Sequence, residues 1–269
     1  MINYTKNDIK KSLKKINLKK GDLIFVNPET FKFGKLVEAK NERDQFEIFF
    51  NIINEIIGPK GTIVSNCYTF QVLRYNKIFD YNNTKTSSGG WSEYLRNLKG
   101  SLRSEHPVYS VIAYGYKKKE ICSNNSNHNY GLNSPYDKFL KLDGKILNLG
   151  MDPELNPFLH VMEYLYGVPY YYNKYTKTKY IKNKKKISKI YSTFVRYLEI
   201  DFSGDLSKLK KGLHSIKIEK SNLGSGKIYL YKANDYCNLV GELLKKDLLS
   251  LASKKIKFKK IINIEKKIH

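Results

Sequence analysis

A strand, a helix and a second strand follow one another near the beginning of the chain, and this succession constrains the fold more than any other feature. A short apolar run at 23–26 is followed at 41–57 by large apolar side chains in helical spacing. Gly58 and Pro59 end that helix, and another apolar run, 62–64, comes directly after. This succession is typical of a βαβ unit, whose two strands lie parallel in one sheet. We therefore expect an α/β fold.

The length and composition are those of a globular protein. With 269 residues, of which 41% are hydrophobic and 13% aromatic, the chain can bury a sizeable core, so we expect a single domain over 1–269. Within it, 170–190 is rich in lysine and tyrosine and is predicted to be an exposed excursion. In the basic tail, 254–269, lysines alternate with isoleucines, and strand, fraying helix and disorder are all open for it.

Apolar runs and cysteines indicate the compartment in which the protein is expected to function. No run approaches the roughly 18 apolar residues of a membrane span, and the first 20 residues lack the apolar core of a secretory signal. We therefore expect a soluble, cytoplasmic protein without membrane contacts. Cys67, Cys122 and Cys237 lie far apart without metal-ligand spacing, so we expect reduced thiols and no bound metal.

The formal net charge is +24, with an isoelectric point near 9.7. Such a charge attracts polyanions and steers anionic ligands toward the protein. The same lysines also suit an ordinary solvated surface, and the chain lacks a helix-turn-helix, zinc-finger spacing and an aromatic RNA-binding motif. A basic nucleic-acid-binding protein without catalysis is therefore the alternative from another functional class, and nucleic acid is not the expected partner.

A histidine and a glutamate lie just beyond the short apolar run at 145–149. Residues 156–157, Asn-Pro, favour a helix start, and Gly167 favours its end. Within that helix His160 and Glu163 are three residues apart and share a face. A histidine held by a carboxylate beyond a strand's end is a candidate general base, although the same spacing occurs in ordinary surface pairs.

Several short segments carry a resemblance to one known family. They are 58–64 (GPKGTIV), 88–93 (SGGWSE), 102–107 (LRSEHP), 133–136 (NSPY), 144–150 (GKILNLG) and 159–164 (LHVMEY). In order and spacing they resemble the aminoglycoside 3-N-acetyltransferases, a family of antibiotic acetyltransferases, over about residues 20–252. The resemblance implies a three-layer α/β/α sandwich with a central mixed, largely parallel sheet. It also implies acetyl-CoA, or another acyl-CoA, as co-substrate.

The resemblance also implies roles for individual residues. His160 matches the family's catalytic base and Glu163 its partner, and Tyr68 matches a tyrosine near the acyl and amine groups. The expected coenzyme contacts are Asn27, Thr30, Arg103 and Ser104, and the expected acceptor contacts are Glu93, His106, Tyr109 and Asp152.

Two departures from the family pattern concern the ligands. Residues 27–30 read Asn-Pro-Glu-Thr where the family has His-Ser-Ser-Leu against the coenzyme, which implies altered coenzyme contacts. Tyr109 replaces the second histidine of a His-Pro-x-His-Ser segment, which implies a changed acceptor or cleft. His160 and Glu163 are unaffected.

The expected chemistry is direct attack of an amine on the thioester, with His160 as base and backbone amides or Tyr68 polarising the carbonyl. A covalent Cys67 intermediate is the alternative, but no base adjoins that residue in the sequence. Because a net charge of +24 attracts polyanions, the favoured acceptor is a nucleotide-linked amino sugar of surface-glycan biosynthesis. An aminoglycoside antibiotic is the alternative acceptor, and monomer and homodimer are both open.

Overall fold

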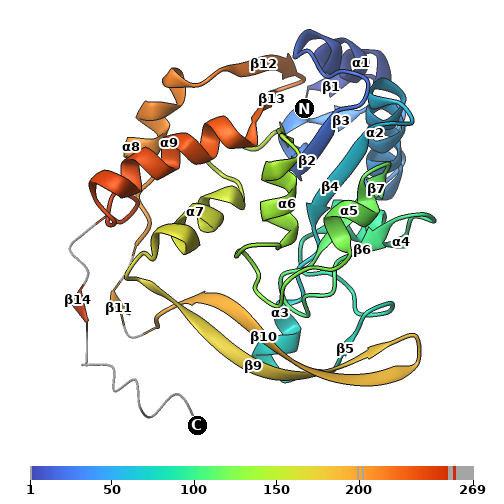
Figure 1. The fold of residues 1–269 in the computed structure, drawn as a ribbon. Helices are drawn as coiled ribbons and strands as arrows, with labels where there is room; N and C mark the ends of the chain where they lie inside the picture. Colours follow the sequence, from blue (N-terminus) through green and yellow to red (C-terminus); the bar gives the residue numbers. More distant parts are fainter. Residues whose placement is uncertain (1, 199, 202, 254–256, 259–269) are drawn as a thin grey trace.

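The computed structural model describes residues 2–198, 200–201, 203–253 and 257–258, and its framework is a seven-stranded mixed sheet (Figure 1). Its strands are β2 (Leu23–Pro28), β4 (Thr62–Asn66), β6 (Leu102–Arg103), β7 (Val111–Gly115), β8 (Lys145–Leu149), β12 (Ile218–Leu223) and β13 (Gly226–Lys232). Their order across the sheet is β12-β13-β8-β2-β4-β7-β6.

Only the centre of the sheet is parallel. There β2 lies between β8 and β4, and Phe25 pairs with Ile146 on one side and Val64 on the other. The outer strands β13 and β7 pair antiparallel with this centre, and β12 and β6 pair antiparallel with them. The α/β fold with a mixed sheet is confirmed, whereas the prediction of a largely parallel sheet is wrong. A tight turn joins β12 to β13, and such a turn allows only antiparallel pairing.

Helices precede and follow these strands. They are α1 (Lys6–Lys15), α2 (Glu42–Ile57), α3 (Phe70–Arg74), α4 (Gly90–Asn97), α5 (Lys118–Cys122), α6 (Pro135–Lys141), α7 (Phe158–Tyr166), α8 (Ser207–Gly212) and α9 (Ala233–Lys246), with 3-10 turns η1 (Thr30–Phe33) and η2 (Leu213–Ser215). Thr5 caps α1 and Asn41 caps α2 through side-chain oxygens that accept backbone hydrogen bonds. The helix expected at 41–57 is therefore confirmed, with Asn41 as its cap.

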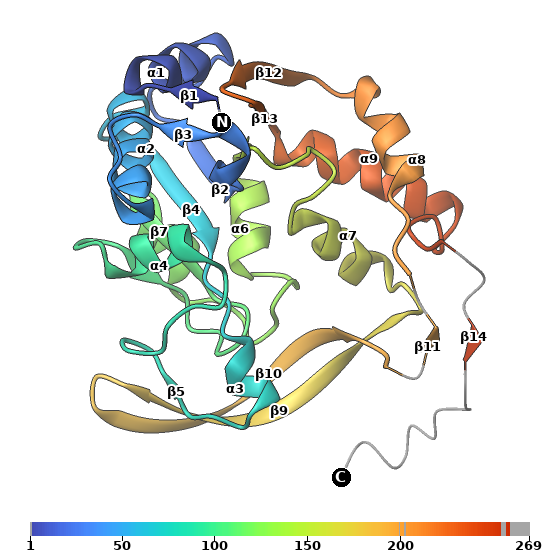
Figure 2. The same ribbon diagram turned by 180° about the vertical axis from the view of Figure 1, so that it is seen from behind.

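Alternate residues of the central strands belong to two different apolar cores. Ile24 and Val26 lie in a core with residues of α1 and α2, whereas Phe25 lies in a core with residues of α6, α7 and α9. Figures 1 and 2 show these helices from opposite sides of the molecule. Because successive side chains of a strand point to opposite faces, helices pack against both faces of the sheet. The three-layer sandwich itself stays a prediction.

A long β-hairpin occupies the segment that the sequence predicts to be an exposed excursion. It consists of β9 (Tyr171–Lys182) and β10 (Lys185–Arg196), and β5 (Phe79–Asp80) adds a third strand beside β9. Its lysines are largely exposed, but Tyr180, Tyr191 and Phe194 are buried. The prediction is therefore wrong for one face of the hairpin, which packs beside α3 in both views (Figures 1 and 2).

Smaller strand pairs complete the described structure. They are β1 (Asn3–Tyr4) with β3 (Lys35–Leu36), and β11 (Ile200–Asp201) with β14 (Lys257–Phe258). Apart from 257–258, the basic tail at 254–269 lies outside the described residues. No helix in the described part of the chain has the length and apolar character needed to cross a membrane. The single domain over 1–269 stays a prediction.

Candidate active site

The helix that carries His160 is fixed at both ends and against a neighbour. It begins at Phe158, whose backbone N–H donates to the Asn156 side chain at 3.0 Å, and Gly167 ends it in the left-handed conformation. The predicted start and end are therefore confirmed to within one residue. Along its length α7 packs on α9, where Gly241 lies against Tyr166. A Cβ at Gly241 would lie 2.9 Å from the Tyr166 hydroxyl, so a larger residue there would require the Tyr166 side chain to shift.

His160 and Glu163 form the predicted pair. The imidazole Nδ1 lies 2.5 Å from Oε2 of Glu163, and the Tyr170 hydroxyl donates to Oε1 at 2.9 Å. The Glu163 side chain is only 4% exposed, whereas that of His160 is 40% exposed. Burial, together with the Glu163 carboxylate, raises the pKa of Tyr170, so its hydroxyl stays protonated as a donor. The carboxylate therefore fixes the ring through Nδ1 and leaves Nε2 as the nitrogen for a substrate proton.

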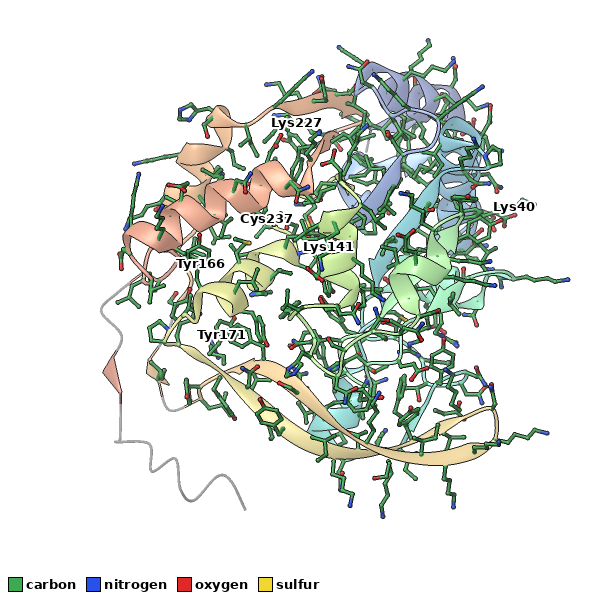
Figure 3. The ribbon with its side chains drawn as sticks, viewed as in Figure 1. Lys40, Lys141, Tyr166, Tyr171, Lys227 and Cys237 are labelled. Atoms are coloured by element: carbon green, nitrogen blue, oxygen red, sulfur yellow. The ribbon has the colours of Figure 1, made fainter. Side chains whose placement is uncertain are left out.

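A row of aromatic rings connects His160 with Tyr68. The ring centroids of Tyr68 and Tyr109 are 4.8 Å apart, those of Tyr109 and Tyr130 are 5.6 Å apart, and those of Tyr130 and His160 are 6.2 Å apart. On its other side, His160 lies 5.9 Å from the ring of Tyr171, which Figure 3 shows where the hairpin leaves α7. The structure thus brings together His160, Tyr68 and Tyr109.

The sequence did not single out Tyr130, Tyr170 or Tyr171. Tyr130 lies in a polar loop, and the other two lie at the beginning of the lysine- and tyrosine-rich segment. Their only signal was the abundance of tyrosine in the chain, which does not separate one tyrosine from another. Contacts between distant segments identify them.

The hydrogen bonds of Tyr68 have a definite direction. Tyr136 donates its hydroxyl proton to Oδ1 of Asn66 at 2.8 Å, so the 2.7 Å bond between Tyr68 and Tyr136 has Tyr68 as donor. Burial raises the pKa of Tyr68 well above its usual value, which keeps this hydroxyl neutral. Its single proton is thus already donated within the protein, and Tyr130 is a further hydrogen-bond partner of its oxygen. This arrangement favours backbone amides over Tyr68 as donors to a developing oxyanion.

Two of the expected coenzyme contacts are buried within the protein. The Arg103 guanidinium, in a residue only 4% exposed, donates to Oγ of Ser110 and to the backbone carbonyls of Thr84 and Cys67 at 2.8–3.0 Å. Ser104 is fully buried and accepts a hydrogen bond from the backbone N–H of Val111. These contacts favour a structural role for Arg103 and Ser104, in holding the loops beyond β4 and β6.

The other two expected coenzyme contacts lie at the end of β2. The Asn27 amide donates to Oδ1 of Asn148 on β8 at 3.0 Å, and the Thr30 hydroxyl donates to Oε1 of Gln45 at 3.3 Å. Both residues are at least 94% buried. Asn27 therefore joins β2 to β8 and Thr30 joins η1 to α2, and their polar groups already have partners inside the protein.

His106 anchors the hairpin. Its Nε2 donates to the backbone carbonyl of Ser192 on β10 at 3.1 Å, while Nδ1 accepts from the backbone N–H groups of Val108 and Tyr109. Burial lowers the pKa of His106 to about 4. A neutral imidazole with both nitrogens bound inside the protein suits a structural clamp better than the expected acceptor contact.

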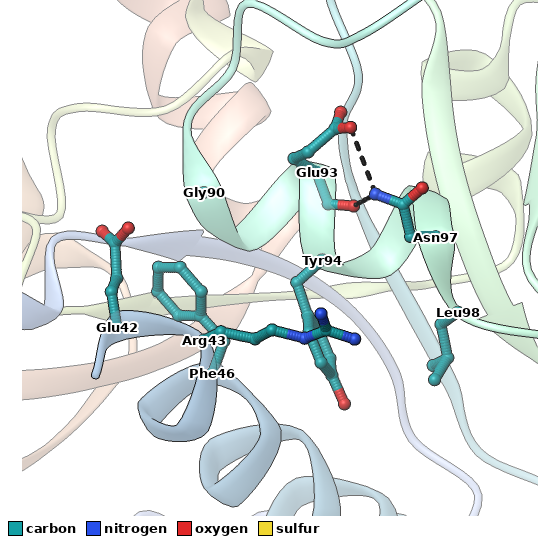
Figure 4. A pocket seen from close by; sticks show the side chains of 8 residues that line it. All are labelled: Glu42, Arg43, Phe46, Gly90, Glu93, Tyr94, Asn97 and Leu98. Atoms are coloured by element: carbon teal, nitrogen blue, oxygen red, sulfur yellow. Dashed lines mark hydrogen bonds between the residues drawn. The ribbon is translucent and has the colours of Figure 1, made fainter. Parts of the chain in front are cut away.

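The expected carboxylate contacts lie outside the cluster around His160. Glu93 belongs to a cavity of about 340 Å³ between α2 and α4, shown in Figure 4. Arg96 binds its carboxylate through two nitrogens, at 2.6 and 2.9 Å. Burial would raise the pKa of Glu93, but hydrogen bonds from Arg96, Thr86 and Asn97 lower it to about 2. Asp152 is exposed beyond β8, and Asn148 binds its backbone carbonyl.

The described residues contain no group of three or more histidine, cysteine, aspartate or glutamate side chains placed to hold a metal ion. Cys67 is fully buried, and burial raises the pKa of its thiol. Since the thiolate is the nucleophilic form, this environment disfavours the alternative of a covalent Cys67 intermediate.

Comparisons with known proteins identify the family and the fold. The family model for aminoglycoside 3-N-acetyltransferases matches residues 37–245. Aminoglycoside N(3)-acetyltransferase III of Salmonella sp is 23% identical over 184 residues, which are 62% of this chain and 62% of the relative. Two solved structures have the same fold. AAC-IIIb in a binary complex with CoASH has a TM-score of 0.75 at 19% identity, covering 94% of this chain and 99% of that one. AAC-VIa bound to sisomicin has a TM-score of 0.73 at 19% sequence identity, and the match covers 91% of this chain and 98% of that one.

The chain spans about three fifths of the length of the curated relatives that it matches. The family model extends from α2 to α9 and includes His160, Glu163 and the aromatic row. By this match over most of its length, the chain belongs to the aminoglycoside 3-N-acetyltransferase family.

Proposed function

We propose that the protein is an acetyl-CoA-dependent N-acetyltransferase that acts on an amino group of an aminoglycoside. One observation carries this proposal: a half-exposed imidazole whose Nδ1 is held by a buried carboxylate. This is the arrangement that a general base requires. The family and the CoASH complex of a structural neighbour support acetyl-CoA as co-substrate.

The proposed reaction begins with loss of one proton from the acceptor's ammonium group to solvent. The free amine attacks the carbonyl carbon of the thioester, the new C–N bond forms as Nε2 of His160 takes a second proton from the nitrogen, and the C–S bond breaks to release the coenzyme thiolate. The proton held by His160 then passes to that thiolate. Glu163 stabilises the imidazolium through Nδ1, and Tyr170 holds the carboxylate in place.

Two classes of acceptor fit this chemistry. The family and a neighbour bound to sisomicin favour the aminoglycoside, against the expectation of a nucleotide-linked amino sugar from charge alone. The net charge of +24 and the position of Glu93 in a cavity between α2 and α4 still suit an anionic acceptor. A nucleotide-linked amino sugar is therefore the second candidate.

A thiol-release assay tests the proposal. Acetyl-CoA is offered with a panel of aminoglycosides and nucleotide-linked amino sugars, and CoA release is followed together with the mass of the product. We expect release with an aminoglycoside, and a loss of about 10²–10⁴-fold in kcat for His160→Ala. His214→Ala, which removes an exposed histidine, is the matched control and should keep full activity. Near-normal turnover by a folded His160→Ala variant would overturn the assignment of the base.

A further inference from the structure

A second cavity lies between α3 and the β9–β10 hairpin. Its volume is about 560 Å³, within the range of roughly 300–1,000 Å³ that is usual for small-molecule sites. Residues 72–78 form one wall, Pro107 and Val108 close one end, and the hairpin supplies the rest. The hairpin residues are Lys174, Thr176, Lys177, Thr178, Lys179, Tyr191 and Thr193. We call this cavity the hairpin groove.

The charge of the hairpin groove is of one sign. Lysines 77, 174, 177 and 179 line it, and no carboxylate is among the described residues that do so. None of these lysines forms an ion pair with a described residue. Glu105, the carboxylate beside Tyr180, is already paired with Lys182. Four cations without counter-charges around one cavity are therefore available to an anionic ligand.

Two hydroxyls of the same cavity are buried. The oxygen atom of Thr176 makes no hydrogen bond to a described residue, and the hydroxyl of Tyr191 interacts with that of Tyr180 only outside normal hydrogen-bond geometry. Tyr191 is 2% exposed, and its ring lies between those of Tyr180 and His106. An unpaired buried hydroxyl costs about 1–3 kcal/mol, so a ligand or a water that it carries would relieve this cost. The cavity thus offers lysine cations together with hydroxyl groups.

The hairpin groove is separate from the cluster around His160. The ring of Tyr191 lies 5.3 Å from that of His106, which lies 6.2 Å from Tyr109, the ring that begins the approach to His160 through Tyr130. The buried His106 therefore stands between the two sites. Since Pro107 and Val108 line the groove, the loop that carries His106 and Tyr109 borders both of them.

We propose that the hairpin groove binds the phosphate group of a small molecule. Lysine ammonium groups bind phosphate as point charges, and hydroxyls donate to its oxygens. The phosphate belongs either to the coenzyme or to a separate phosphorylated ligand. Binding of a phosphate compound here can be measured without acetyl transfer.

The test is calorimetric titration of the full-length protein with inorganic pyrophosphate. Lys77→Met with Lys174→Met removes two groove charges while keeping most of each side-chain stem. Lys185→Met with Lys186→Met removes two charges from exposed positions of the same hairpin and is the matched control. We expect saturable binding, weakened at least tenfold in the groove variant and less than threefold in the control. An equal loss in both variants, or no saturable binding to the wild type, would overturn the proposal.

Two further substrates identify the source of the phosphate. If a phosphate of the coenzyme occupies the groove, the groove variant raises KM for acetyl-CoA. KM for acetyl-dephospho-CoA then stays unchanged when the occupant is the 3′-phosphate and rises as well when it is the diphosphate. If a separate ligand occupies it, both KM values stay unchanged while pyrophosphate binding is lost. Either result supports a phosphate site and assigns its occupant. Because pyrophosphate is titrated without acetyl transfer, failure of this test is distinct from failure of the proposed activity.

Discussion

Both carboxylate oxygens of Glu163 have hydrogen-bond partners, His160 on one side and Tyr170 on the other. Glu163→Gln presents an amide that can turn an N–H toward Nδ1 and so favour the wrong imidazole tautomer, and we expect kcat to fall about 10²–10⁴-fold. Tyr170→Phe removes one hydrogen bond to a charged group, and we expect a decrease of about tenfold. Steady-state kinetics should show both losses in kcat, with KM for acetyl-CoA nearly unchanged.

The matched control for Tyr170→Phe is Tyr75→Phe, because Tyr75 is 69% exposed. It should leave kcat unchanged. Losses that appear only in KM, with kcat intact, would contradict a role in orienting the base. Thermal unfolding of each variant checks that the substitution has not unfolded the protein.

At the scale of single residues, whether a contact could be predicted depends on how far apart the two residues lie in the sequence. His160 and Glu163 lie on one turn of one helix, so their spacing alone predicted the contact. Arg103 and Glu93 were assigned to ligands, yet each is held by protein groups that come from other segments or from its own helix. Sequence reasoning gives the chemistry of such a side chain, whereas its partner is decided by tertiary packing.

At the scale of elements, His106 ties the loop before β7 to the hairpin, and this predicts a pH dependence of stability. Its pKa is about 4 in the folded protein and about 6.5 in the unfolded chain. Between these values the unfolded chain binds the proton, so the free energy of unfolding decreases as the pH falls from about 6.5 to about 4. The largest loss from this group is about 3 kcal/mol, and it is absent above about pH 7.

Urea unfolding of the wild type and of His106→Gln at pH 7 and at pH 4.5 measures this contribution. The variant should be less stable at pH 7, since it loses the imidazole contacts with Ser192, Val108 and Tyr109. It should also lose less stability than the wild type on going to pH 4.5. The same pH dependence in both proteins would contradict the assignment. His214→Gln, at an exposed position, is the control.

How closely an element could be predicted depends on the sequence pattern that encodes it. α2 and β8 have periodic or continuous apolar residues with clear stop signals, and their positions were predicted closely. The hairpin was not recognised, because its lysines hide an alternation in which Tyr180 and Tyr191 face inward. That inner face is buried by α3 and β5, two short elements in a polar segment without periodicity.

At the scale of the whole molecule, the net charge of +24 acts on the two substrates with opposite signs. Acetyl-CoA is a polyanion that the field attracts, whereas an aminoglycoside is a polycation that the field repels. Salt screens both effects, because the Debye length falls from about 30 Å at 0.01 M to about 10 Å at 0.1 M ionic strength. The salt dependence of kcat/KM therefore shows whether the field of the protein attracts or repels each substrate as it approaches the site.

We expect kcat/KM for acetyl-CoA to fall as sodium chloride is raised from 20 to 300 mM, and kcat/KM for an aminoglycoside to rise over the same range, with kcat nearly constant. A nucleotide-linked amino sugar should instead follow acetyl-CoA, because both carry phosphate. Initial rates at subsaturating concentrations of each substrate in turn give these slopes. An aminoglycoside whose kcat/KM falls with salt would mean that carboxylates near the site outweigh the field of the whole protein, since local charges act over shorter distances. The sign of one slope thus separates recognition by local groups from attraction by the molecule as a whole.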